Sequence, residues 1–444
     1  MNPVIRLAGL IMVAAVAAVL LTACGEEGGK AGDTAAATSE RPVSSSFRFV
    51  TGIAVKNPPA IPMPAKGVPI TDPNFNTTVT RITDRTVDGY QGPGISNEYA
   101  KADPENSDGS LLVLRGNDAS WYIYDAVSLR MIRKLSDDVA GGAPEFEPRW
   151  DPGDPKLFYY LFGAELRSYN TDTEATTTVH DFKADVPGAV YITTGSEGDA
   201  SLDRRYWAFV VKDADFNVIA VAVYDRQTDR VIGRKDSFPD SVNFVSMDMS
   251  GRHCIVGYDS IPYEIFSRDL ASSVTLPHGA AGHGDAAMTT DGRDVMVYQN
   301  VATDFISMAD LDTGAETRLL EIPFSVNIDI GLHVSGNSAA VPGWVLISTY
   351  GSKAPEPGKQ HSWMDEELFM LELKENPRVW RLADTHSYTS LDFSEEKNYF
   401  AETFAAINTG GARVYFASNW DNLVTDYSEV YRVELPAGWR ETLP

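Results

Sequence analysis

Short apolar runs alternate with tight polar turns along most of the chain, and helical periodicity is almost absent. Four of these runs span residues 110–114, 156–160, 206–211 and 293–298, and each follows a turn. Most neighbouring turns are separated by about 40 to 50 residues, which is the period of propeller blades. The six clear turns are Asp108-Gly109, Gly153-Asp154, Asp203-Arg204, Ser250-Gly251, Asp291-Gly292 and Gly410-Gly411.

The second half of each unit also repeats, as an apolar strand, a short polar turn and another strand. Two strand pairs per period make a four-stranded blade, so we expect an all-β propeller. The six turns and a degenerate unit near Gly336-Asn337, which carries a long insertion at 350–363, predict seven blades, with six or eight as alternatives. We expect residues 78–82 to complete the last blade, built from 414–435, and so close the ring. Two β-sandwiches are the weaker alternative because they predict no constant period.

The N-terminus has the features of an export signal. Arg6 precedes an apolar run at 7–21 that is short for a bilayer span, and Leu21-Thr22-Ala23-Cys24 ends it. This ending resembles a bacterial lipobox, which implies cleavage before Cys24, lipidation of Cys24 and, with Gly25 following, an outer-membrane location. We therefore divide the chain into a signal peptide (1–23), an acylated cysteine with a flexible, disordered tether (24–46) and the propeller (47–444).

The composition and charge of the chain exclude some classes of binding partner. The 444 residues are 43% hydrophobic and carry a formal net charge of −25, with the acidic residues scattered along the chain. Such a surface argues against nucleic acid and against an anionic lipid face. The expected partners are the membrane, through the N-terminal lipid, and a polysaccharide or an envelope protein. Apart from Cys24 the chain has one thiol, Cys254, which we expect to be a buried strand residue.

The repeat "strand, Asp-Gly, strand, loop, strand, polar turn, strand" resembles the TolB-type (PD40) propeller repeats of periplasmic bacterial proteins. Residues 402–408, 413–420 and 429–433 look like the closing blade of the oligogalacturonate lyases. That resemblance implies a seven-bladed propeller holding a divalent metal, typically manganese, with histidines and a glutamine. The chain matches this metal pattern only in Gln360-His361, and Phe404 stands where related blades often carry a polar residue.

In a propeller the strand before each Asp-Gly turn is innermost. Charged residues that occupy the same position relative to each turn, here called one repeat phase, should therefore converge near the channel. Within the fifth unit, His283 and Asp285 are two residues apart in a predicted strand and should point the same way. They are candidates for a cation site with Gln299, or for a His–Asp pair; a structural hydrogen-bond network is the alternative. The residues at this phase are Lys101, Glu147, Glu197, His283, Asp285 and Glu402.

Two further histidines lie in predicted rim loops, where propellers often bind ligands. His361 belongs to the polar insertion, and His386 lies on the loop entering the last blade; a solvated loop histidine is the alternative for each. We assign His180, His253 and His333 to structure, since none has a partner close in sequence.

Two functions fit these patterns. The first is an outer-membrane lipoprotein that binds a ligand or protein through its channel mouth or rim loops, facing the periplasm or the cell surface. The alternative is a metal-dependent lyase acting on uronate-containing polysaccharides, with manganese or calcium as its metal. In the alternative His283 or His361 is the base or a ligand, Asp285 and Gln299 are metal partners, and Arg149 holds the carboxylate. The other candidate binding residues are Lys101, Glu147, Glu197, Glu402 and His386.

Overall fold

A computed structural model describes residues 47–141, 145–277, 283–424 and 426–444. The chain divides into a unit of residues 1–39 and a unit of residues 40–444. The predicted signal peptide, Cys24 and the tether lie outside the described residues. Within the described part of the chain, no helix is long and apolar enough to span a bilayer.

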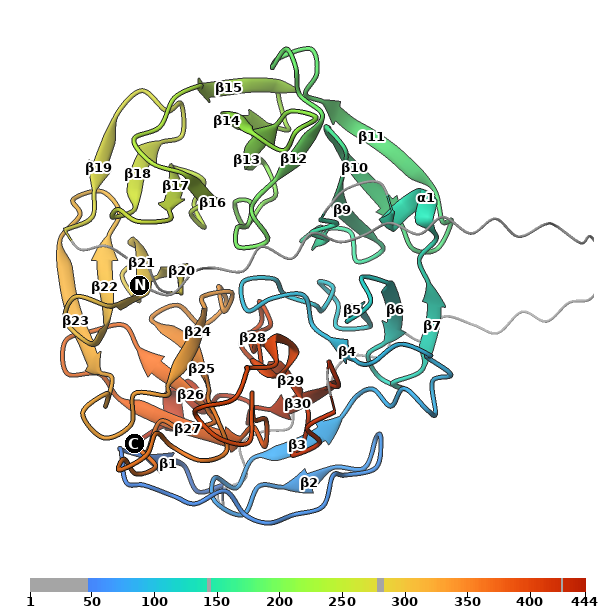
Figure 1. The fold of residues 1–444 in the computed structure, drawn as a ribbon. Helices are drawn as coiled ribbons and strands as arrows, with labels where there is room; N and C mark the ends of the chain where they lie inside the picture. The colour runs from blue at the N-terminus through green and yellow to red at the C-terminus, as the bar shows by residue number, and fades with distance from the viewer. Residues whose placement is uncertain (1–46, 142–144, 278–282, 425) are drawn as a thin grey trace, which may run out of the picture. The chain divides into compact units, whose positions relative to one another are not determined.

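Seven antiparallel sheets of four or five strands stand around a common axis and form a propeller (Figure 1). Blade 1 contains β4 (Ile95–Ser96), β5 (Leu111–Gly116), β6 (Trp121–Asp125) and β7 (Met131–Lys134). Blade 2 contains β8 (Arg149–Trp150), β9 (Leu157–Phe162), β10 (Glu165–Asn170) and β11 (Thr176–Asp181). Blade 3 contains β12 (Tyr191–Thr193), β13 (Tyr206–Lys212), β14 (Val218–Asp225) and β15 (Arg230–Lys235). Blade 4 contains β16 (Val242–Met247), β17 (His253–Tyr258), β18 (Glu264–Ser267) and β19 (Ser273–Thr275).

The last three blades follow the same order, with N-terminal strands added to two of them. Blade 5 contains β20 (Gly284–Met288), β21 (Asp294–Asn300), β22 (Phe305–Asp310) and β23 (Glu316–Glu321). Blade 6 contains β24 (Gly331–Ser335), β25 (Trp344–Tyr350), β26 (Glu367–Glu372), β27 (Val379–Asp384) and β1 (Val50–Thr51). Blade 7 contains β28 (Ala406–Ile407), β29 (Arg413–Ser418), β30 (Glu429–Glu434), β3 (Thr78–Arg81) and β2 (Ile70–Thr71). The helical segments are α1 (Asp137–Ala140), η1 (Tyr399–Ala401) and α2 (Trp439–Thr442).

The position of a strand in its blade explains its apolar pattern. The second strands, such as β9 and β13, are buried along nearly their whole length because neighbouring blades cover both of their faces. The outermost strand β11 is mostly exposed and polar. Seven apolar clusters fill the seven interfaces between neighbouring blades, including the interface between blades 7 and 1. Cys254 is fully buried in one of them, as expected, and burial raises the pKa of its thiol.

The first and last parts of the chain close the ring. β3 pairs with β30 from Thr78 opposite Glu434 to Arg81 opposite Tyr431, which confirms the predicted closure of the last blade. Arg413 of blade 7 donates from Nε to Glu105 of blade 1 at 2.6 Å, and the Tyr415 hydroxyl also donates to Glu105. The pairing of β1 with β27 was not predicted. Two sandwiches are excluded, because each interface joins sheets that are adjacent around one ring.

Candidate functional site at the propeller axis

The inner strands of several blades are short, and the chain beside them continues irregularly toward the axis (Figure 1). In blade 1, β4 ends at Ser96 and ladder pairing resumes only at Glu105 opposite Leu112. These irregular segments and the neighbouring strand ends bring side chains from blades 1, 3, 5, 6 and 7 into one group. We call this group the central cluster; it consists of Tyr99, Lys101, Glu197, His283, His333, Tyr350, Glu402 and Phe404.

Two imidazoles form the middle of the central cluster. The ring centroids of His283 and His333 are 4.4 Å apart. His283 Nδ1 lies 2.9 Å from the Tyr99 hydroxyl, and His283 Nε2 lies 3.4 Å from the Tyr350 hydroxyl. A neutral imidazole has one donor and one acceptor nitrogen, so one tyrosine donates to His283 and the other accepts from it. The ring of His333 packs on Tyr350 and Phe404, with centroid distances of 5.0 and 4.9 Å.

Burial keeps both imidazoles neutral. His333 is 1% exposed, and within the described part of the chain neither of its ring nitrogens has a hydrogen-bond partner. Burial and the neighbouring His283 and Lys101 lower the pKa of His333 well below its ordinary value. Burial also lowers the pKa of His283, although Glu197 opposes the shift. Neutral imidazoles can act as bases or as metal ligands, so the cluster holds its histidines in a reactive form.

The charged residues of the cluster are Lys101, Glu197 and Glu402. Lys101 Nζ lies 3.0 Å from Glu197 Oε2. Burial would raise the pKa of Glu197, but Lys101 and His283 lower it below the ordinary value. Burial raises the pKa of Glu402 to about 7, and its Oε2 lies 3.7 Å from His333 Nε2. Glu197, His283, Tyr350 and Glu402 are only partly buried, so solvent reaches the cluster.

Of the six residues predicted to share one phase, Lys101, Glu197, His283 and Glu402 lie in the central cluster. Asp285 does not pair with the His283 ring; it accepts backbone N–H groups of Gly336 and Ala286 at 2.7 and 2.9 Å, which matches the alternative of a structural hydrogen-bond network for this residue. Burial raises the pKa of Asp285 to about 7. The side chains of residues two apart diverge here because His283 precedes the first residue of β20 and is outside the regular pleat.

Glu147 and Arg149 belong to a different network. Glu147 accepts hydrogen bonds from the Thr193 hydroxyl and the Thr194 backbone, and burial together with Glu145 raises its pKa to about 8. Arg149 is buried, and its guanidinium lies 2.6 Å from Glu98 and 3.2 Å from Asp199. A carboxylate ligand would have to displace these partners. The prediction that Arg149 holds the carboxylate of a substrate therefore has no geometric support.

Within the described residues, no hydrogen bond, ion pair or ring contact joins the side chains of the remaining predicted residues to the rings of His283 and His333. Gln299 contacts His283 through the backbone, with its N–H donating to the His283 carbonyl at 2.9 Å. His386 is buried against Trp420, with ring centroids 4.3 Å apart, and burial lowers its pKa to about 4. It is therefore not a solvated rim side chain. His361 is 43% exposed in the β25–β26 connection, and its Nδ1 lies 3.0 Å from Asp365 Oδ2.

Sequence reasoning missed His333 and Tyr350, and it did not place Tyr99 beside His283. The degenerate turn was expected near Gly336-Asn337, but the β24–β25 connection runs over residues 336–343, so no clear turn marked β24 and the repeat phase picked no residue in it. No sequence signal places Tyr99 beside His283, because their contact depends on the irregular path after β4.

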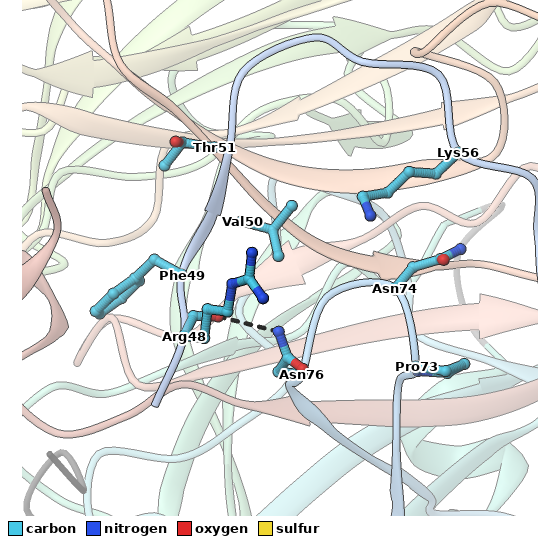
Figure 2. Close-up of a pocket in the computed structure, with 8 residues that line it drawn as sticks. All are labelled: Arg48, Phe49, Val50, Thr51, Lys56, Pro73, Asn74 and Asn76. Carbon is cyan, nitrogen blue, oxygen red and sulfur yellow. Dashed lines mark hydrogen bonds between the residues drawn. The ribbon is translucent and has the colours of Figure 1, made fainter. Parts of the chain in front are cut away.

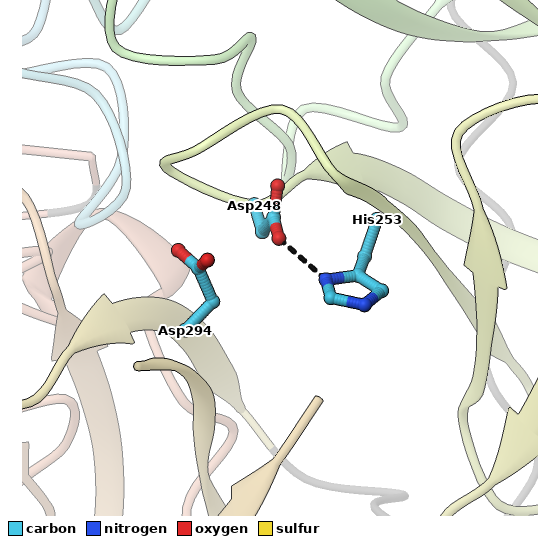
Figure 3. Close-up of side chains that lie close together, drawn as sticks. All are labelled: Asp248, His253 and Asp294. Atoms are coloured by element: carbon cyan, nitrogen blue, oxygen red, sulfur yellow. Dashed lines mark hydrogen bonds and ion pairs between the residues drawn. The ribbon is translucent and has the colours of Figure 1, made fainter. Parts of the chain in front are cut away.

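His253, which the sequence analysis also gave a structural role, lies in a second cluster at the interface of blades 4 and 5 (Figure 3). His253 Nδ1 lies 2.6 Å from Asp248 Oδ2, and Nε2 lies 3.1 Å from Asp312 Oδ1. Arg252 contacts Asp294 at 3.0 Å and Asp312 at 3.3 Å. We call Asp248, Arg252, His253, Asp294 and Asp312 the interblade cluster.

The central cluster does not reproduce a three-ligand metal site. Among the described residues, two groups of three side chains have possible ligand atoms within 4.8 Å of one another. They are Asp248, His253 and Asp294, and His361, Asp365 and Glu366; neither contains His283, Asp285 or Gln299. Both ring nitrogens of His283 face tyrosine hydroxyls, and Phe404 packs on His333. We therefore derive no step through a metal at the axis.

A pocket of about 390 Å³ lies on the outer side of blades 6 and 7 (Figure 2). Its lining comes from the N-terminal segment around β1 and from the turn before β3, and it contains none of the predicted site residues. The lining residues are Arg48, Phe49, Val50, Thr51, Lys56, Pro73, Asn74 and Asn76.

Comparison by sequence finds no matching protein family and no matching curated protein. Comparison by structure finds an oligogalacturonate lyase from Vibrio parahaemolyticus, with a TM-score of 0.56 and 13% identity, covering 84% of this chain and 100% of that one. It also finds an oligogalacturonate lyase in complex with manganese, with a TM-score of 0.56 and 14% identity, covering 83% of this chain and 96% of that one. The chain therefore has the seven-bladed β-propeller fold that is seen in oligogalacturonate lyases.

Proposed function

We propose that this protein is a lipoprotein of the bacterial outer membrane whose propeller binds a carbohydrate at the central cluster. The observation that carries the proposal is the partly exposed His283, whose ring lies between the hydroxyls of Tyr99 and Tyr350. A site with aromatic walls and a few convergent polar groups suits a sugar, which offers hydroxyls at its edge and an apolar ring face. Tyr399 is 51% exposed and its ring lies 5.0 Å from Phe404, so it offers such a face beside the cluster.

The ligand class is taken from the structural neighbours, because the charges of the cluster do not select it: Lys101, the cation inside the cluster, already pairs with Glu197. The two structural neighbours are lyases named for oligogalacturonate, an acidic sugar chain. We therefore expect uronate-containing oligosaccharides to bind more tightly than neutral ones.

Binding is tested by titration calorimetry of the purified full-length protein with neutral and uronate-containing oligosaccharides. His283→Ala should weaken binding at least tenfold, which is about 1.4 kcal/mol. Tyr399→Ala should weaken binding less, because the exposed ring contributes contact area alone. Tyr191→Ala is the control, since Tyr191 stacks on Phe216 in blade 3 rather than on the central cluster. Equal affinity of wild type and His283→Ala would contradict the proposal.

The membrane anchor is tested separately. If Cys24 is acylated, the protein should partition into detergent and Cys24→Ser should partition into the aqueous phase. Mass spectrometry of the N-terminal peptide should show lipid on Cys24. An unmodified Cys24 in protein recovered from the native envelope would contradict the anchoring while leaving carbohydrate binding to its own test.

A second candidate function is cleavage of the bound uronate chain by β-elimination, and the neutral His283 favours it. In this reaction the base takes the proton on the carbon next to the carboxylate. The C–O bond to the leaving sugar breaks, a carbon–carbon double bond forms, and an acid protonates the leaving oxygen. In this candidate function His283 is the base and a tyrosine hydroxyl beside it is the acid.

Elimination predicts an unsaturated product that absorbs in the ultraviolet. Tyr350→Phe should then reduce kcat while leaving binding nearly unchanged, and His283→Ala should abolish turnover. Tight binding with no ultraviolet-absorbing product from any uronate polymer would leave the protein as a binding propeller.

A further inference from the structure

The long β25–β26 connection of blade 6 ends in three consecutive carboxylates, and their surroundings differ. Glu367 accepts from Arg381 Nε at 2.6 Å. Asp365 accepts from Asn327 Nδ2 at 3.0 Å and from the Ser362 backbone at 3.1 Å. Glu366 lies between these two satisfied side chains.

Glu366 is 2% exposed, and no hydrogen bond or ion pair engages its carboxylate among the residues that the structure describes. The charges nearest to it are further carboxylates, those of Asp365, Asp329, Asp384 and Glu367. The cations in this region are already engaged, because Lys397 pairs with Asp329 and Arg381 pairs with Glu367.

A buried carboxylate without a partner is costly, so it must either take up a proton or bind a cation. Burial and the four neighbouring carboxylates raise the pKa of Glu366 well above its ordinary value, which describes the first outcome for the chain alone. The second outcome requires other ligand atoms within reach, and these are present. Possible ligand atoms of His361, Asp365 and Glu366 all lie within 4.8 Å of one another.

We propose that His361, Asp365 and Glu366 bind a divalent cation of the class that accepts both imidazole and carboxylate ligands, such as Mn²⁺ or Zn²⁺. His361 is 43% exposed and gives the ion a path from solvent. The ion neutralises the excess of buried carboxylates. It also fixes the connection that begins after Tyr350, whose hydroxyl contacts His283. The inference stands on these residues and does not depend on carbohydrate binding.

The interblade cluster shows why the other group of three possible ligands needs no ion. There Arg252 pairs with Asp294, and His253 contacts a carboxylate at each ring nitrogen. The chain supplies its own cations at the interblade cluster, whereas no described cation pairs with Glu366.

The test uses the full-length protein, freed of metal with a chelator and dialysed against MnCl₂. We expect about one retained Mn²⁺ per chain by elemental mass spectrometry and a rise in Tm on adding Mn²⁺. Glu366→Gln keeps the shape and removes the charge, so it should weaken Mn²⁺ binding at least tenfold and remove the Tm response. His361→Ala alters an exposed side chain that the fold does not need, and it should also weaken binding.

Two controls separate this site from others. Glu356→Gln makes the same charge change in the same connection and should retain Mn²⁺. His283→Ala should also retain it, because His283 lies in the central cluster. The inference is overturned if the wild-type protein retains no Mn²⁺, if Glu366→Gln retains as much as the wild type, or if His283→Ala alone loses the ion.

Discussion

The central cluster and the interblade cluster surround their histidines with opposite environments. His253 contacts a carboxylate at both ring nitrogens, and these carboxylates raise its pKa although burial opposes the shift. His333 has no hydrogen-bond partner within the described residues, and burial lowers its pKa. The first arrangement joins two blades and stabilises the ring. The second leaves polar groups unsatisfied at the axis, as is typical of groups held ready for a ligand.

The largest effect on stability is expected at Asp248, which is fully buried. Its carboxylate accepts from His253 and from the Arg252 backbone at 2.8 Å. Asp248→Asn removes the charge that pairs with His253 and should lower the free energy of unfolding by about 3 kcal/mol. Urea denaturation measures this, with Asp312→Asn as the control, because Asp312 is about half exposed and its loss should cost far less. Equal losses in the two variants would show that burial of the interblade cluster is not what stabilises it.

At the central cluster, removing a histidine should raise the free energy of unfolding rather than lower it. His333→Leu replaces a buried ring without hydrogen bonds by an apolar side chain, so we expect the free energy of unfolding to rise by about 1 kcal/mol. Affinity for the carbohydrate should fall in the same variant. A loss of stability comparable to that of Asp248→Asn would mean that His333 is a structural residue.

The two clusters should also differ in their response to pH. Because the folded pKa of His253 is raised, its contribution is present below the unfolded value near 6.5 and is lost as pH rises through the folded pKa. The difference in unfolding free energy between wild type and His253→Gln should therefore shrink as pH rises from 6 to 9. His333→Gln should show a change of the opposite sign, because the folded state keeps His333 neutral while the unfolded chain takes up a proton near pH 6.5, so the wild type gains stability relative to the variant as pH rises. Parallel pH profiles for the two variants would contradict the assignment.

The smallest effect on stability is expected for Tyr350→Phe. It removes a hydroxyl that lies 3.4 Å from His283 Nε2 and also hydrogen-bonds Glu402 at a partly exposed site, so the free energy of unfolding should change by less than about 0.5 kcal/mol. Thermal denaturation measures this, and a larger loss would show that the hydroxyl has a structural role.

Much of the fold could be predicted because a propeller repeats its local pattern. The turns at Asp108-Gly109 and Asp291-Gly292 each precede a buried second strand. Residues 78–81 precede the first repeat, and they pair with the last blade as expected. The strand β1 could not be predicted, because Val50–Thr51 has only two residues and no repeat partner.

The candidate site was predictable only in part. Lys101 and Glu197 share a repeat phase and do meet, since both lie on irregular segments beside inner strands. His333 and Tyr350 could not be placed by phase, because the turn after the strand of His333 is long and Tyr350 ends a second strand. Arg149 was predicted to hold a substrate carboxylate, but its partner Glu98 lies on the neighbouring blade and cannot be found from spacing along the sequence.

The most direct test of the central claim is nuclear magnetic resonance of protein labelled at its seven histidine rings, before and after addition of a uronate oligosaccharide. Binding at the axis should shift the imidazole signals of His283 and His333 and leave those of His253 and His180 unchanged. Saturable binding that leaves the signals of His283 and His333 in place would contradict the claim that the central cluster is the ligand site.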